Sequence, residues 1–240
     1  MAGRGSKGGT RDPRSRSRGK HVRVKTARGR KLSSTRWLER QLNDPFVAEA
    51  RRLGYRARSA FKLMGIDDKF QILRRARRIV DLGAAPGGWA QVVVERGSKN
   101  MKLLGIDLQD IEPLEGAEFL KMDLLAADAE ERLMAALDGP ADLVLSDMAN
   151  AATGHKQTDH LKTMALCEAA LDFALKVLAP GGAFVAKVLV GGTESQLLAT
   201  MKQNFAVVRH FKPDASRQES SELYVVAKGF KGAAGNKDRG

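Results

Sequence analysis

A glycine-rich turn is the part of the chain best suited to hold a small ligand. It lies in R-I-V-D-L-G-A-A-P-G-G-W, residues 78–89, where a short apolar run leads into a turn that opens a helix. Nucleotide-binding α/β domains present backbone N–H groups to their ligands at such a turn. The glycines do not follow the G-x-G-x-x-G spacing of dinucleotide sites, and the turn lacks the Lys and Ser/Thr of a phosphate loop. This spacing argues against NAD and against tight binding of a nucleoside triphosphate.

Two aspartates narrow the choice of ligand. Asp107 closes the second expected strand, where a carboxylate can accept hydrogen bonds from both hydroxyls of a ribose. Asp123 closes the third strand and can accept one from the exocyclic amine of adenine. Either residue taken singly could equally be a turn or helix cap. As a pair at the ends of successive strands, they indicate a ligand with adenine and ribose but no pyrophosphate, of which S-adenosylmethionine is the common example.

Lys187 is a second residue that could do chemistry, because it interrupts the apolar run A-F-V-A-K-V-L-V. Central strands of α/β domains are covered on both faces, so a charge inside one needs partners. The alternative is a lysine near the strand end whose ammonium group reaches solvent. The sequence by itself leaves both interpretations open.

The elements that would position these residues follow from the hydrophobic pattern. A helical pattern starts at Asp44 and continues to Phe70, and a long helix is expected from Asp159 to Leu178, ended by the P-G-G of residues 180–182. Strand-like runs then alternate with helical stretches, which predicts βαβ units and a mostly parallel sheet. The last two runs leave no room for a crossover helix and should pair antiparallel. The expected strands are residues 79–82, 102–106, 118–122, 142–145, 183–190, 205–211 and 223–227.

Charge is concentrated at the start of the chain. The formal net charge is +13 and the pI is near 10.1, which points to a polyanionic partner. Residues 1–31 hold twelve basic residues and one acid, so this segment contributes +11 of that charge. The segment has too few large apolar side chains for burial to offset the conformational entropy that ordering would cost. We therefore expect a disordered arm that either captures nucleic acid or is merely solvated. The expected division is this arm, one catalytic domain over 32–228 and a flexible tail over 229–240.

Three further features of the sequence bear on membrane association, on the redox compartment and on metal binding. No apolar run approaches the ~20 residues that span a bilayer, so no membrane partner is expected. Cys167 is the single cysteine, which excludes an internal disulfide and suits a reducing, cytoplasmic compartment as a buried thiol. His155 and His160 have no Cys or carboxylate spacing that would complete a metal site, and we interpret them as loop and cap residues.

The segments D-L-G-A-A-P-G-G-W, G-I-D-L at 105–108, M-D at 122–123 and S-D-M at 146–148 together resemble the RrmJ/FtsJ family of ribose 2′-O-methyltransferases. The resemblance covers approximately residues 36–230. It implies a Rossmann-like S-adenosylmethionine-dependent methyltransferase fold, with a mostly parallel seven-stranded sheet, a C-terminal antiparallel hairpin and no metal. The implied cofactor-binding residues are Gly87, Trp89, Asp107, Asp123 and Asp147. The implied catalytic tetrad is Lys62, Asp147, Lys187 and Glu222, which match the family's Lys-Asp-Lys-Glu in order.

Within the family, the chain is most similar to bacterial enzymes that methylate a uridine in the A loop of large-subunit (23S) ribosomal RNA. The resemblance therefore implies ribosomal RNA within the large subunit as partner, and we expect a monomer. One departure is Asn150, which stands where the family commonly has proline after S-D-M-A and removes a fixed φ angle from that loop. Transfer RNA, an RNA cap, and a catalytically silent ribosome-assembly role remain alternatives.

Methyl transfer to a hydroxyl requires that the acceptor oxygen be aligned and its proton removed. The resemblance implies Lys187 as the base, yet a free lysine with a pKa of ~10.4 is only about 0.1% neutral near pH 7.4. A second mechanism keeps Lys187 charged to orient the hydroxyl while Asp147 helps to take the proton.

For RNA, two arginine clusters could contact phosphates or be solvated faces, and the loop 212–221 is expected to border the substrate. The clusters are Arg51, Arg52, Arg56 and Arg58, and Arg74, Arg75, Arg77 and Arg78.

Overall fold

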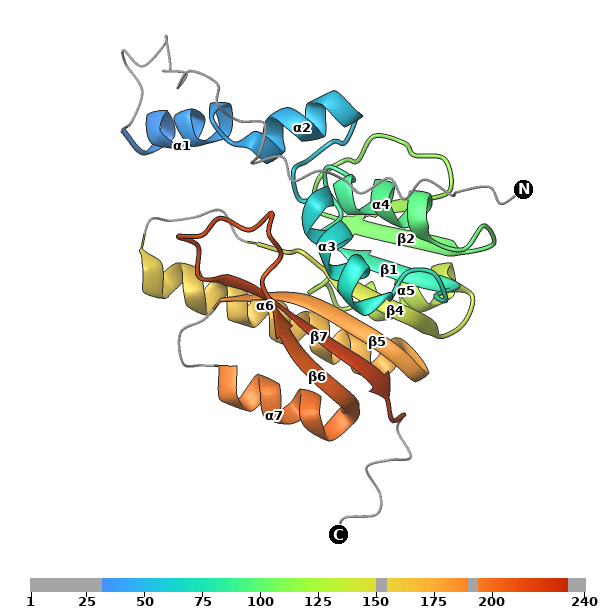
Figure 1. Ribbon diagram of the computed structural model, residues 1–240. Helices are drawn as coiled ribbons and strands as arrows, with labels where there is room; N and C mark the ends of the chain where they lie inside the picture. The colour runs from blue at the N-terminus through green and yellow to red at the C-terminus, as the bar shows by residue number, and fades with distance from the viewer. Residues whose placement is uncertain (1–31, 150–154, 190–193, 233–240) are drawn as a thin grey trace, which may run out of the picture. The chain divides into compact units, whose positions relative to one another are not determined.

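The computed structural model describes residues 32–149, 155–189 and 194–232 (Figure 1). The chain forms two compact units, with the boundary between Arg58 and Ser59. The basic arm, Asn150 and the end of the tail lie outside the described residues. Within the described ranges, no helix is both long and apolar enough to cross a membrane.

The described part of the first unit, from residue 32 onward, contains two helices, α1 (Leu32–Leu42) and α2 (Pro45–Leu53). Asp44 caps α2, because its side chain accepts a hydrogen bond from the Phe46 N–H. Gly54 ends α2 with a left-handed φ of 80°, a conformation that glycine adopts without a Cβ clash. The helical pattern expected from Asp44 to Phe70 is therefore split, and the next helix begins only at Ala60.

The second unit is built on one seven-stranded sheet of order β3-β2-β1-β4-β5-β7-β6. Strands β1 to β5 pair in parallel, and β7 runs antiparallel to both of its neighbours, which confirms the expected sheet and C-terminal hairpin. The strands are β1 (Arg78–Leu82), β2 (Lys102–Asp107), β3 (Glu118–Lys121), β4 (Ala141–Ser146), β5 (Leu178–Leu189), β6 (Phe205–Phe211) and β7 (Glu222–Phe230). The helices are α3 (Ala60–Phe70), α4 (Gly88–Arg96), α5 (Ala129–Leu137), α6 (Lys156–Val177) and α7 (Glu194–Asn204).

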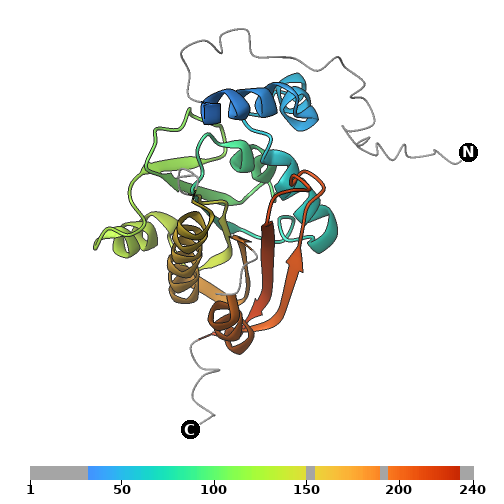
Figure 2. The ribbon, with the colours of Figure 1, turned by 90° about the vertical axis from the view of Figure 1, so that its left-hand side faces the viewer.

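Helices cover both faces of this sheet (Figures 1 and 2). Helices α5, α6 and α7 lie on one face, where apolar residues such as Val80, Val144 and Phe184 form the larger part of the core. Cys167 is buried in the same cluster, as expected for a structural thiol. The strand residues in between face α3 and α4, so central strands are apolar on both sides.

One boundary differs from expectation. The segment P-G-G at 180–182 does not separate α6 from β5, because β5 already starts at Leu178 and contains it. The pairing of β4 with β5 shifts here, from Ala141 opposite Leu178 to Leu143 opposite Ala183. A bulge thus accommodates residues that sequence reasoning assigns to a turn.

The sheet topology defines where a ligand can bind. Strand order reverses between β1 and β4, which are neighbours although β2 and β3 separate them in sequence. Open α/β sheets bind ligands outside the carboxyl ends of the strands at such a switch point. Asp107 ends β2, and Asp147 directly follows β4 at this edge.

Candidate active site

Lys62 and Glu222 come from distant parts of the chain and form an ion pair. Lys62 lies in the first turn of α3 and Glu222 is the first residue of β7. The Lys62 Nζ lies 2.6 Å from Glu222 Oε1, and both side chains are largely shielded from solvent. Each residue alone has the features of a surface residue in the sequence, and the fold brings the two together.

Lys187 and Asp147 form the second pair of the tetrad. The Lys187 Nζ donates to the backbone carbonyl of Asp147 at 2.6 Å and to Asp147 Oδ1 at 3.1 Å. The Lys187 side chain is only 9% exposed, so it is not a strand-end lysine that reaches into water. The partner that its place inside an apolar strand requires is thus Asp147.

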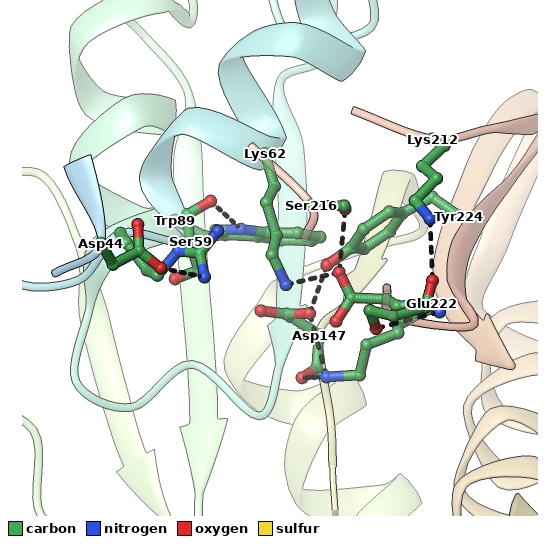
Figure 3. Close-up of polar contacts among 12 residues, drawn as sticks. Asp44, Ser59, Lys62, Trp89, Asp147, Lys212, Ser216, Glu222 and Tyr224 are labelled. Atoms are coloured by element: carbon green, nitrogen blue, oxygen red, sulfur yellow. Dashed lines mark hydrogen bonds and ion pairs between the residues drawn. The ribbon is translucent and has the colours of Figure 1, made fainter. Parts of the chain in front are cut away.

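The two pairs lie against each other (Figure 3). The labelled side chains of Lys62, Asp147, Glu222 and Tyr224 point toward one another from α3, the end of β4 and β7. Burial alone would raise the pKa of Asp147, but the charges of Lys187 and Lys62 and hydrogen bonds from Tyr224 and Lys187 outweigh it and lower that pKa. Asp147 is therefore an anion at neutral pH, held between two lysines.

Two polar contacts at this site have no counterpart among the sequence predictions. The Tyr224 hydroxyl donates to Asp147 Oδ1 at 2.6 Å, and the Ser216 hydroxyl donates to Glu222 Oε1 at 3.0 Å. Ser216 belongs to the loop 212–221, whose Lys212 donates to the carbonyls of Gln218 and Ser220. The loop thus borders the tetrad, although the charge of Lys212 is directed at its own backbone. For Tyr224 the signal available in sequence is its E-x-Y spacing, which places it on the same strand face as Glu222.

A cleft of about 430 Å³ opens beside the tetrad at the switch point. Asp107, Asp123, Asp147 and Lys187 line it together with residues after β1, β2 and β4. Asp107 accepts backbone N–H bonds from Ala85 at 3.0 Å and from Gln109 at 2.9 Å, and Asp123 accepts one from Leu125 at 2.9 Å. Both aspartates therefore hold turns and also face the cleft. Its volume is within the range of ordinary small-molecule sites.

The glycine turn is expected to present its backbone N–H groups to a ligand, but most of these groups donate to acceptors within the protein. The N–H groups of Gly83 and Ala84 donate to the Ile106 carbonyl, and that of Gly87 donates to the Ala84 carbonyl. With Ala85 bound to Asp107, the turn directs these amides at the protein itself. Gly83 and Ala85 of this turn line the cleft, whereas Gly87 and the first residues of α4 are buried.

Two residues of the turn have defined roles. Gly83 has a φ of +77°, and a Cβ there would lie 2.6 Å from Met148 Cγ, so the glycine permits β1 and β4 to end side by side. Trp89, expected to contact the cofactor, is buried, and its indole N–H donates to the Ser59 carbonyl at 2.9 Å. Its ring packs on Tyr224 with the centroids 5.7 Å apart. The Trp89 side chain thus joins α4 to the start of α3 and to β7.

Asp81 is a fourth carboxylate near the cleft. It lies in β1, is 1% exposed, and neither of its oxygens has a hydrogen-bond partner among the described residues. Burial, followed by repulsion from Asp147 and Asp107, raises its pKa to about 8. Asp81 therefore carries a proton at neutral pH, in contrast to Asp147.

The arginine clusters differ in their surroundings. Arg74, Arg75 and Arg77 are exposed before β1, at the end of the sheet opposite the tetrad. In the first unit, Arg58 pairs with Asp44 at 2.6 Å and Arg52 pairs with Glu49 at 2.7 Å. The structure describes no group of three or more potential metal ligands in the ranges it covers.

Comparison with known proteins places these features in context. Residues 55–230 match the model of the family described as FtsJ-like methyltransferase. A protein of Novosphingobium aromaticivorans named ribosomal RNA large subunit methyltransferase E is 59% identical over 212 residues, covering 88% of this chain and 95% of its own. A protein of the same name from Cereibacter sphaeroides is 57% identical over 227 residues, covering 91% and 93%. Among solved structures, a ribosomal RNA methyltransferase from Plasmodium falciparum has a TM-score of 0.66 and 31% identity, over 74% of this chain and 100% of that one.

Proposed function

Because the chain belongs to the FtsJ-like methyltransferase family, we propose that it methylates the 2′-hydroxyl of a ribose in large-subunit (23S) ribosomal RNA, with S-adenosylmethionine as donor. The proposed target is the A-loop uridine, and the proposed setting is the maturing large subunit in the cytoplasm. The protein would act as a monomer. The relatives' names support ribosomal RNA as the substrate class.

One observation carries the proposal: Asp147 and Lys187 belong to the donor cleft and to the tetrad at once. Lys62 and Glu222 approach Asp147 from α3 and β7, and neither is among the residues that line the cleft. An acceptor hydroxyl held at Lys187 would therefore lie between the donor and the ion pair. Such alignment is what in-line transfer between two bound molecules requires.

The cleft fits the adenosine part of the donor. Asp107 would accept from the ribose hydroxyls and Asp123 from the adenine amine. When bound, S-adenosylmethionine supplies an electrophilic methyl group on a positively charged sulfur. The acid-lined cleft suits a cationic ligand better than a polyphosphate.

Lys187 is the proposed base. Its two hydrogen bonds to Asp147 fix the nitrogen and leave a further tetrahedral position for the acceptor oxygen. In the amine form that position is a lone pair that takes the hydroxyl proton, and the Asp147 anion then stabilises the ammonium. The Lys62–Glu222 pair would hold the acceptor ribose from the other side.

Transfer of labelled methyl groups tests the function. Wild-type protein and Lys187→Met are incubated with labelled S-adenosylmethionine and, separately, large ribosomal subunits, naked 23S ribosomal RNA or transfer RNA. We expect wild type to label large-subunit RNA, and nuclease digestion to give 2′-O-methyluridine, while Lys187→Met gives background.

The other outcomes point to the alternatives. Labelling of transfer RNA alone would make transfer RNA, rather than ribosomal RNA, the substrate. A product methylated on the base would contradict methyl transfer to the ribose 2′-hydroxyl. Equal, background labelling by both proteins on all RNAs, with RNA binding retained, would favour the assembly factor without turnover.

Donor affinity provides a separate prediction at Asp107. Asp107→Asn keeps the shape of the side chain but removes the charge that would strengthen hydrogen bonds from a ribose. Such bonds contribute about 1.5–3 kcal/mol, so the Kd for S-adenosylmethionine should rise roughly 10- to 100-fold in calorimetric titration. Asp110→Asn is the control, since Asp110 is exposed nearby and pairs only with Lys121 among the ion pairs the structure describes. Equal affinities of Asp107→Asn and wild type would contradict the assigned donor site.

A further inference from the structure

Tyr224 is buried at the centre of the tetrad. It is 0% exposed and lies directly opposite Lys187 in the antiparallel pairing of β5 with β7. Side chains opposite each other in such a pair project from the same face of the sheet. Glu222, two residues earlier in β7, shares that face. The fold thus surrounds Tyr224 with groups of the tetrad.

The hydroxyl of Tyr224 and the side-chain nitrogen of Lys187 donate hydrogen bonds to the same oxygen of Asp147. It donates to Asp147 Oδ1 at 2.6 Å, and Lys187 Nζ donates to that oxygen at 3.1 Å. A short bond to an ionised acceptor is of the stronger, charge-assisted kind. It contributes to the lowered pKa of Asp147, together with the two lysines. Tyr224 therefore favours the charged carboxylate and limits its rotation.

The ring of Tyr224 is itself held in place. Trp89 packs on it at a centroid distance of 5.7 Å and an interplanar angle of 40°, and Lys62 Nζ lies 5.7 Å from its centroid. Trp89 is fixed in turn by its bond to the Ser59 carbonyl next to α3. The hydroxyl is consequently directed at Asp147 by contacts that involve α3 and α4.

We propose that Tyr224 is a positioning residue for methyl transfer, which fixes the Asp147 carboxylate in its charged form so that Asp147 can orient Lys187. The inference rests on the proposed function, because it assigns Lys187 to the acceptor oxygen. Tyr224 is not a catalytic residue, since its buried hydroxyl is not among the groups lining the cleft. It acts through Asp147.

Tyr224→Phe removes the hydroxyl and keeps the ring. Without this donor, the ionisation midpoint of Asp147 should move upward by about one pH unit. The shift is measured by carbon NMR of the enzyme labelled at aspartate carboxyl groups, with Asp147→Asn to assign the resonance. In the methyl-transfer assay, kcat should fall about tenfold, equivalent to one such unit, while the KM for S-adenosylmethionine stays within about twofold.

Tyr55→Phe is the matched control, because it removes the chain's other tyrosine hydroxyl. It should leave the Asp147 midpoint at the wild-type value. Tyr224→Leu removes the ring as well as the hydroxyl. The difference between its unfolding temperature and that of Tyr224→Phe measures how much packing of the ring stabilises the fold. An unmoved midpoint in Tyr224→Phe, whether or not activity falls, would overturn the proposal and leave Tyr224 a packing residue.

The two readouts separate this inference from the proposed function. The NMR titration uses enzyme without RNA, so it holds or fails independently of the substrate. If wild type transfers no methyl group to ribosomal RNA, the function fails. If wild type is active and Tyr224→Phe retains wild-type kcat at every pH, the positioning role fails while the function stands.

Discussion

Lys187→Met is expected to lower kcat for methyl transfer by about 10²- to 10⁴-fold, the usual contribution of a general base. Methionine retains much of the apolar stem but neither donates to Asp147 nor accepts a proton. The effect is measured in single turnovers at saturating S-adenosylmethionine, so that the chemical step is observed. Binding of the donor, followed by calorimetry, should persist.

Lys187→Arg distinguishes the two mechanisms. A guanidinium stays charged and can orient a hydroxyl, but it cannot take a proton. If Lys187 is the base, Lys187→Arg is as inactive as Lys187→Met. Substantial activity in Lys187→Arg would instead show that the cation orients the acceptor while Asp147 helps to take the proton. Wild-type activity in Lys187→Met would remove Lys187 from the mechanism altogether.

Asp81→Asn is expected to stabilise the folded chain by on the order of 4 kcal/mol at pH 7. The pKa of Asp81 is about 8 in the fold, against an ordinary value of 3.8. Between these values the folded chain holds a proton that the unfolded chain has lost, so this group makes stability fall as pH rises. Asparagine has a similar shape and does not titrate there.

Denaturant unfolding at several pH values between 4 and 9 checks this expectation. Wild type should lose stability relative to Asp81→Asn across the range, with the difference largest above pH 8. Asp172→Asn is the control, because Asp172 is exposed on α6 and a surface change of this kind stays within about 0.5 kcal/mol. Equal stability of wild type and Asp81→Asn at pH 8 would show that Asp81 has a partner in solution.

The sheet and its helices follow from sequence because periodicity reports which faces are buried. Most strand runs alternate with helices at the spacing of βαβ units, although β3 follows β2 without a helix in the residues 108–117 between them. The short connection before β7 permits only antiparallel pairing. Two expected element boundaries are wrong, at Gly54 and at the P-G-G segment, and for opposite reasons. Gly54 ends a helix inside a continuous helical pattern, whereas P-G-G is absorbed by a bulge in β5 because pairing with β4 overrides local turn preference.

The site follows from sequence only in part. Lys187 is conspicuous, since a charge inside an apolar strand demands a partner. Lys62 and Glu222 are ordinary singly, and the family resemblance rather than periodicity identifies them. Tyr224 escapes notice because an aromatic residue in a buried strand is indistinguishable from core. The internal bonding of the glycine turn also depends on where Ile106 and Asp107 place their oxygens, which no local pattern encodes.

The position of β7 in the sheet has a consequence for synthesis of the protein. Of the strands that the structure describes, β7 leaves the ribosome last, yet it inserts between β5 and β6 and brings both Glu222 and Tyr224. At about 5–20 residues per second, a nascent chain that already carries the donor cleft must wait seconds for Glu222, the fourth member of its tetrad. Until then β5 and β6 present unpaired edges. Nascent chains stalled before residue 222 should therefore be able to engage the donor without being able to use it.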